Sequence, residues 1–436
     1  DTIRPRFIGG YCARNTPTGF LTDFSNTFIQ KYGLTYRGIQ FIAATVDLGF
    51  RDKIFSETAI LQGNVDNKSV LVNSQVRIDP FVSGFITDLF YNVSSDRTAK
   101  IERKFVKVPV GEGNYIYLGD INNNGILDEF DFQLVNFGGD YIRLNIPTNE
   151  FFPTVDLRTS AKITFRPSRF INLKSGNIIN DIINNFSSET FFRVDEKSKD
   201  PDTDNLYYLK FSTFQNDSNT LQGTELIQQD LNFFENNPDY SIRFRFLQTR
   251  GFSQYSSGNE RGLNIQRSVR IKIGLSKDIG TQLDITNKTD RNIAPAGSIR
   301  NRNINSEGAT VDFIYRPIQQ IESGFAVNFT KATDFYPLTP TEANINQQTL
   351  RFIYSFTSIG RIRIELERAE ISLSENLVTF PYELTNGRIN GKSYFIRGIF
   401  DYSISRNIQA SLNYDGRLEG SRRLLNTARA QVTAFF

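Results

Sequence analysis

The amino-acid sequence predicts an all-β protein, an antiparallel transmembrane β-barrel built as a meander. Apolar and polar residues alternate in many separate stretches of the 436-residue chain, and short polar connections join several of them. No stretch holds the run of about 18 uncharged apolar residues that a membrane-spanning helix needs. A barrel remains compatible with that absence, because its strands carry apolar residues only at every second position. We expect about 14 to 20 strands.

The alternation has the period of a β-strand with one apolar and one charged face. In 361–367, Ile362, Ile364 and Leu366 share one face, and arginines and glutamates occupy the other. The same alternation recurs in 155–163, 241–246, 268–275, 350–356 and 408–414.

The connections between these stretches are of two kinds. Short polar connections at 357–360 and 405–407 predict tight hairpins. Longer polar stretches predict long loops, and an outer-membrane barrel has short turns at one end and long loops at the other. These longer stretches are 196–205, 215–223, 285–308 and 373–392.

The rest of the organisation follows from two departures from period two. Isoleucines at helical spacing in 176–186 predict a short amphipathic loop helix, either inside a plug or packed on its own domain. The second departure lies within 111–150, which we interpret as an insertion between strands. Barrel strands are then expected in 1–110 and in 151–436, the latter ending in a C-terminal β-signal.

Alternation alone also fits soluble β-sandwich domains, because each sandwich sheet buries one face and exposes the other. Three features favour the barrel. The last stretch alternates up to Phe436, which resembles the C-terminal signature of bacterial outer-membrane barrels. The 39 Phe and 18 Tyr suit aromatic girdles. Pairs of like charges on one face, such as Arg243 with Arg245 and Arg361 with Arg363, suit a water-filled lumen.

Composition excludes several classes of function. Lys and Arg total 50 against 47 Asp and Glu, so charge gives no reason to expect a nucleic-acid partner. The single cysteine, Cys12, excludes an intrachain disulfide, and the absence of histidine excludes histidine-dependent catalysis and zinc binding. We therefore expect no enzyme. A carboxylate-based outer-membrane enzyme is kept as a third hypothesis, although no particular pair of carboxylates is indicated.

Residues 120–131 match a twelve-position calcium loop. Gly125 falls at position 6, where the chain must turn sharply. The final residue is aspartate, which resembles a dockerin-type loop, although only one such loop is present. An Asn/Asp-rich turn without metal is the alternative. The expected role of Ca²⁺ is structural, and the expected ligands are Asp120, Asn122, Asn124, the carbonyl of Ile126, Asp128 and Asp131.

Three further segments carry a family resemblance. Residues 99–120, 380–388 and 412–436 resemble the C-terminal regions of large Bacteroidota-type surface proteins that are predicted to form outer-membrane β-barrels. The resemblance implies a location in the bacterial outer membrane and a chain that is the C-terminal part of a longer precursor. It implies no activity.

Together these observations predict an outer-membrane β-barrel that acts as a pore, scaffold or surface anchor with a structural calcium loop. The expected partners are outer-membrane lipid and other envelope proteins, and nucleic acid is not expected. The alternative is a secreted, calcium-stabilised β-sandwich module for adhesion or structure.

Overall fold

A computed structural model describes the chain except for residues 1, 16–20, 62–65, 122–124, 126, 172–175, 296–297, 299, 357–358, 375–379, 421–422 and 436. Side chains are also left undescribed at 1–23, 96–97, 99–100, 137 and 149–151. Cys12 and Phe436 therefore lie outside the described side chains.

Twenty β-strands form one sheet. They are β1 (Thr2–Asn15), β2 (Leu21–Ile39), β3 (Ile42–Phe55), β4 (Asn67–Ile78), β5 (Phe85–Lys107), β6 (Gly113–Tyr117), β7 (Phe132–Gly139), β8 (Tyr141–Phe165), β9 (Phe186–Ser198), β10 (Thr220–Phe233), β11 (Tyr240–Tyr255), β12 (Gly258–Gly274), β13 (Ile279–Ile293), β14 (Arg302–Ile318), β15 (Ile321–Asp334), β16 (Thr341–Phe356), β17 (Gly360–Leu373), β18 (Gly391–Ser405), β19 (Ile408–Glu419) and β20 (Leu425–Ala434).

Short helices lie only in the connections of the described chain: α1 (Glu57–Leu61), α2 (Ile178–Asn184), α3 (Asp204–Tyr207), α4 (Tyr382–Thr385) and the 3₁₀ turns η1 (Glu129–Asp131), η2 (Pro167–Arg169) and η3 (Phe211–Thr213). None of the described helices is long and apolar enough to cross a membrane. Helix α2 confirms the loop helix predicted at 176–186. Asn177 caps it by accepting a hydrogen bond from the backbone N–H of Ile179 at 3.1 Å.

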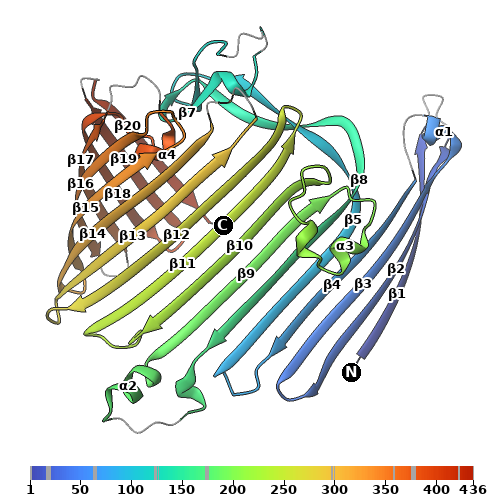
Figure 1. Ribbon diagram of the computed structural model, residues 1–436, viewed down its shortest axis with the longest axis horizontal. Helices are drawn as coiled ribbons and strands as arrows, with labels where there is room; N and C mark the ends of the chain where they lie inside the picture. Colours follow the sequence, from blue (N-terminus) through green and yellow to red (C-terminus); the bar gives the residue numbers. More distant parts are fainter. Residues whose placement is uncertain are drawn as a thin grey trace.

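Eighteen strands form an antiparallel meander in chain order, with β5 paired to β8 across an insertion that holds β6 and β7. This confirms the predicted all-β antiparallel fold. The sheet curls strongly, so that β12 and β13 lie in front of β18–β20 (Figure 1). The two edge strands of the meander are β1 and β20, and no pairing joins them among the described residues.

The two ends of the sheet differ in the length of their connections. At one end, here called the turn end, β2–β3, β14–β15 and β18–β19 are joined by two residues each. Its exception is the connection that carries α2. The opposite end, here called the loop end, carries the insertion and the long connections 199–219 and 374–390. The predicted tight hairpins at 357–360 and 405–407 both lie at the turn end.

The two faces of the sheet differ in chemistry. Leu350 pairs with Leu366, which pairs with Ile396, so these side chains form a row on one face, here called outward. The adjacent row, Arg351, Glu365 and Arg397, lies on the inward face. Leu350 keeps 51% of its surface exposed. The β-sandwich alternative is wrong, because one sheet forms the fold and its apolar face is exposed rather than packed against a second sheet.

The polar stretch 285–308 is mostly strand, and the long loop predicted there is wrong. β13 continues to Ile293 and β14 begins at Arg302. Asn287, Glu307 and Lys331 pair in register and continue the outward face towards the loop end. Polar residues on both faces are compatible with a strand here because the sheet extends beyond its apolar zone into a region where polar residues can meet water.

Candidate functional site

The insertion at the loop end crosses the concave side of the sheet (Figure 1). We call residues 101–147 the strap. It consists of the ends of β5 and β8 together with the hairpin β6–β7. Near its base, Ile101 bridges to Tyr255 of β11. Farther along, the side chain of Asn136 donates a hydrogen bond to the carbonyl of Asn386, between β17 and β18, at 2.8 Å. The strap therefore connects parts of the rim that are six strands apart in the sheet.

Four charged side chains join the strap to the inward rim in a closed ring. Arg103 lies 2.7 Å from Glu129 and 2.8 Å from Glu260. Arg300 lies 3.0 Å from Glu129 and 2.9 Å from Glu260. Exposed fractions are 7% for the Arg103 side chain and 4% for that of Glu129. Each arginine therefore contacts both carboxylates, and removing one arginine would leave two largely buried carboxylates with a single positive partner.

Neighbouring groups fix the orientation of this ring. The hydroxyl of Ser257 donates to Glu129, and the amide of Asn292 donates to Glu260 at 3.1 Å. The guanidinium of Arg103 lies over the ring of Tyr255, 3.6 Å from its centroid. These contacts hold the four charges at defined positions and indicate a rigid junction between strap and wall.

A second segment, the connection around α4, also folds onto the inward face. Leu384 is 1% exposed and packs with Ile304, Ala332 and Ala343 of the rim. Glu383 lies 3.1 Å from Arg302. Burial raises the pKa of the Glu383 carboxyl above its ordinary value, although Arg302 opposes the shift.

A cavity of about 470 Å³ lies between the strap, the α4 connection and the rim. Tyr115, Arg143 and Glu383 are among its lining residues. Asp334 also lines it, is 1% exposed, and has one carboxylate oxygen without a hydrogen-bond partner in the described structure. The opening that the curled sheet leaves at the loop end, here called the mouth, is thus narrowed by polar and aromatic groups but retains space for a small solute.

Below the mouth, ion pairs cover the inward face. They lie within one strand or join neighbouring or nearby strands, and they are partly exposed, which fits a surface in contact with water. Examples are Arg245 with Asp230 at 2.7 Å, Arg270 with Asp284 at 2.6 Å, Arg351 with Asp312 at 2.7 Å and Arg363 with Glu365 at 3.0 Å.

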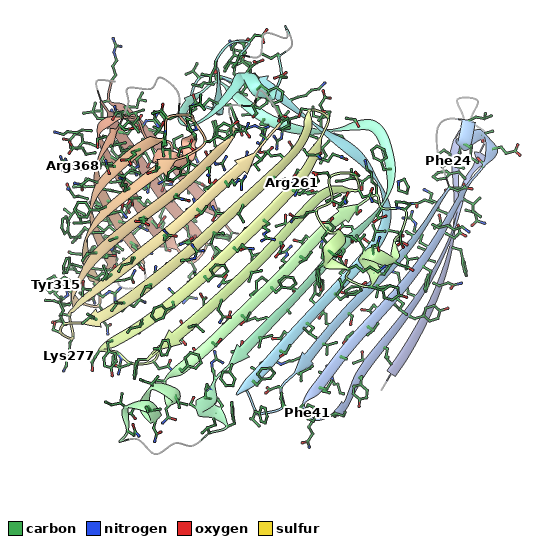
Figure 2. All side chains as sticks on the ribbon, in the orientation of Figure 1. Phe24, Phe41, Arg261, Lys277, Tyr315 and Arg368 are labelled. Atoms are coloured by element: carbon green, nitrogen blue, oxygen red, sulfur yellow. The ribbon has the colours of Figure 1, made fainter. Side chains whose placement is uncertain are left out.

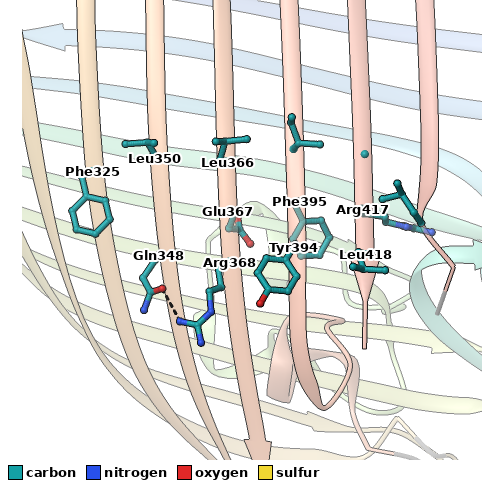
Figure 3. Close-up of a pocket in the computed structure, with 13 residues that line it drawn as sticks. Phe325, Gln348, Leu350, Leu366, Glu367, Arg368, Tyr394, Phe395, Arg417 and Leu418 are labelled. Carbon is teal, nitrogen blue, oxygen red and sulfur yellow. Dashed lines mark hydrogen bonds between the residues drawn. The ribbon is translucent and has the colours of Figure 1, made fainter. Parts of the chain in front are cut away.

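On β16 and β17 the outward face changes from apolar to polar between neighbouring rows (Figure 3). Phe325, Leu350 and Leu366 form a row across β15, β16 and β17. In the next outward row towards the loop end, Arg368 donates a hydrogen bond to Gln348 at 2.9 Å (Figure 3). On β15 the same row is still apolar, with Val327 opposite Gln348.

The predicted calcium loop lies in the strap, between β6 and β7. Asn122, Asn124 and Ile126 lie outside the described residues. The carboxylate of Asp120 accepts a hydrogen bond from the N–H of Gly125 at 2.8 Å. Asp131 is fully buried, and its carboxylate accepts from the N–H groups of Ile121 and Asp128. No cluster of three metal-ligating side chains occurs among the residues that the structure describes.

The ion ring was not predicted from the sequence. Arg103, Glu129, Glu260 and Arg300 belong to segments far apart in the chain, and no spacing signal connects them. The only available signal was that residues 111–140 depart from the strand period. That signal says nothing about which residues of the rim the segment contacts.

Comparison with known proteins gives structural likeness only. No family model matches the chain, and no curated protein is similar to it. Solved structures of similar shape include OccK11 (OpdR) of Pseudomonas aeruginosa, with 10% identity, TM-score 0.38, and coverage of 100% of this chain and 95% of the other. The siderophore receptor PirA of Acinetobacter baumannii has 9% identity and TM-score 0.41 over 99% of this chain and 68% of the receptor.

The ferric-catecholate import receptor Fiu of E. coli K12 has 10% identity and TM-score 0.40, over 95% of this chain and 64% of the receptor. These TM-scores lie below 0.5. The fold of this chain is therefore established by its own strand pairings and the division of its two faces.

Proposed function

We propose that the chain forms the wall of a bacterial outer-membrane β-barrel, a water-filled pore whose mouth is narrowed by the strap. The observation that carries this proposal is the division of one curled sheet into an exposed apolar face and an ion-paired face. A wall between lipid and water has this arrangement. The resemblance of 99–120, 380–388 and 412–436 to Bacteroidota-type barrel proteins supports the same location.

Two adjacent residues of β17 offer a direct test of the two faces. Ile364 is outward and 40% exposed, whereas the inward side chain of Arg363 is 41% exposed. Single Ile364→Cys and Arg363→Cys variants, made with Cys12→Ser, are labelled with a small fluorophore and reconstituted in vesicles. We expect brominated lipid to quench the label at position 364 and a water-soluble quencher to reach the label at 363. Equal quenching of both positions by lipid would contradict the proposal.

Conductance tests the pore itself. In planar bilayers we expect the reconstituted chain to conduct ions, and Arg103→Gln to conduct more because it removes one corner of the ring that holds the strap. A lipid-quenched label at 364 without conductance in either protein would instead indicate a scaffold or anchor.

We also propose that residues 120–131 bind Ca²⁺ and stiffen the tip of the strap. Gly125 has φ +70°, the left-handed conformation that glycine adopts readily. Its N–H bonds to Asp120, as expected for the sharp turn of a calcium loop. Asp131 would close the loop through its two backbone hydrogen bonds.

Protease protection tests the calcium proposal. We expect Ca²⁺ to protect residues 111–140 and chelator to remove the protection, with Mg²⁺ as the control ion. Asp120→Ala combined with Asp128→Ala should abolish the dependence on calcium. Unchanged calcium-dependent protection in that double variant would contradict the proposal.

A further inference from the structure

A groove with a volume of about 630 Å³ lies on the outward face near the loop end. One side is formed by the connection 199–219, which folds back over the outward face and contributes Phe211 and Phe214. The opposite side is formed by β11, β12 and β13. The groove therefore opens away from the lumen, outside the strap and its cavity.

Three exposed arginines line this groove. Arg250 of β11 pairs with Leu263 of β12, and Leu263 pairs with Arg291 of β13. Arg250, Leu263 and Arg291 thus lie in one row across the three strands, and their side chains share the outward face. Because adjacent strands are about 4.8 Å apart, the backbones of the two arginines are roughly 10 Å apart, with a leucine between them. Arg261, the third arginine, lies on the same face of β12, two residues from Leu263 and nearer the loop end (Figure 2).

The acidic groups around the groove leave part of this positive charge available. Glu225 is 3.8 Å from Arg250, and Asp217 is 2.9 Å from Arg261. The third carboxylate, Glu196, also lines the groove and is 2% exposed; one of its oxygens accepts hydrogen bonds from Thr220 and the N–H of Gln215, and the other has no partner in the described structure. Arg291 forms no ion pair within the described part of the chain.

Two isoleucines lie on the outward face next to the groove on its turn-end side, in a row that also holds Gln248 and Thr289 and that is followed on β12 by Arg267. Ile265 follows Leu263 along β12, and Ile227 of β10 occupies the same row through Gln248. The groove therefore brings exposed arginines next to apolar side chains on the outward face. A ligand that complements it has an anionic head and an apolar body.

We propose that this groove binds a lipid with a phosphate headgroup, whose phosphate lies between Arg250 and Arg291 and whose acyl chains extend over Ile265 and Ile227. Arginine forms paired, charge-assisted hydrogen bonds with phosphate oxygens, which suits this pairing of groups. The proposal rests on the proposed membrane-spanning function, because only a lipid-facing surface presents this groove to acyl chains.

The test uses the full chain in nanodiscs of phosphatidylcholine that contain a small fraction of spin-labelled phosphatidic acid. We expect the wild-type protein to immobilise phosphatidic acid in preference to spin-labelled phosphatidylcholine. Arg250→Gln with Arg291→Gln should lower that preference about tenfold or more, since each basic residue near a membrane surface contributes measurably to binding of anionic lipid. Arg250→Lys with Arg291→Lys keeps the charge and should retain most of the preference.

Two controls separate the alternatives. Arg361→Gln removes an equally exposed arginine from the inward face and should leave lipid selectivity unchanged. An equal preference in the wild type and the Gln double variant would overturn the proposal, as would displacement of the labelled lipid by inorganic phosphate alone, which would indicate a site for free anions. Failure of lipid quenching at Ile364→Cys would refute the membrane-spanning function itself, whereas quenching there without selectivity would refute only the lipid site.

Discussion

Two segments at the loop end fold back onto opposite faces of the same sheet. The connection 199–219 lies on the outward face, where Leu206 is 2% exposed and packs against Val93 and Leu157. The strap crosses the inward side and is joined to the rim by the ring that contains Arg103 and Glu129.

The difference follows from the surface that each segment meets. Outward positions are apolar along much of each strand, so a segment folding outward gains stability by burying apolar area. The strap meets inward positions that carry ion pairs and is held there by matching charge with charge, although the α4 connection also buries Leu384 on this face. Burial of apolar side chains tolerates small displacements, whereas a four-member ion ring specifies one position. The connection 199–219 thus covers apolar side chains of the outward face, whereas the ion ring holds the strap at one defined position across the mouth.

Arg103→Gln should have the largest effect. It leaves Glu129 and Glu260 with Arg300 as their shared partner in a ring that is largely buried, and breaking a buried ion pair costs about 3–5 kcal/mol. We expect local opening of the strap, measured by hydrogen exchange at the amides of β6 and β7, to become easier by that amount. The amides of β11 should be unaffected.

Arg143→Gln is the matched control for this change. Arg143 lies on the strap, is exposed, and sits 5.7 Å from the ring of Tyr115, with no ion pair in the described chain. We expect a change below about 1 kcal/mol, as for a weak exposed cation–π contact. If the amides of β6 and β7 exchanged equally fast in Arg143→Gln and Arg103→Gln, the ion ring would not be what holds the strap in position.

Leu206→Ala should have the next largest effect, and it should destabilise only the connection 199–219 on the outward face. Truncating a buried leucine costs about 2–4 kcal/mol when the cavity does not collapse fully. We expect faster exchange at the amides of Leu209 and Lys210, which bond to carbonyls in 205–206, while the strap keeps its protection. Leu338→Ala, at a fully exposed leucine, should change neither segment. Loss of strap protection in Leu206→Ala would show that the two segments are coupled.

The sequence predicted the wall better than the mouth, for a physical reason. Alternation at residues such as Ile362 and Ile364 reports the two faces directly, because side-chain direction in a strand depends only on the backbone period. The same reasoning failed at 285–308, where polar residues on both faces were interpreted as a loop although β13 and β14 continue there. A strand that passes from lipid into water loses its alternation without losing its hydrogen bonds.

The mouth depends on contacts between distant segments. Glu129 and Glu260 come together with Arg103 and Arg300 only because β5 and β8 extend past their neighbours and bend across the rim. No local pattern encodes that bend. The calcium loop is the reverse case, since its spacing is local and predicts a site, while three of its expected ligands lie outside the described residues.

Lowering the pH should stabilise the folded conformation of the α4 connection. Burial raises the pKa of Glu383, so the folded segment holds this proton more strongly than the unfolded one. Its contribution to stability is therefore present at low pH and is lost as pH rises through the folded-state pKa. We expect protease protection of 374–390 to fall with rising pH in the wild type. Glu383→Gln, which cannot ionise, should flatten this dependence, and an unchanged pH profile in that variant would assign it to another group.

The smallest effect is expected from an ion pair of the open wall. Arg361 and Asp401 are 4.0 Å apart and about half exposed, and such pairs contribute roughly 0–1 kcal/mol because water and salt screen them. A double-mutant cycle of Arg361→Gln and Asp401→Asn, followed by urea unfolding in detergent, measures the coupling directly. The corresponding cycle with Arg103→Gln and Glu260→Gln should give a clearly larger coupling that depends less on salt. Equal coupling energies would mean that the ion ring of the strap is as exposed to water as the ion pairs of the inward face. The contrast between the buried ring and the solvated inward face would then be wrong.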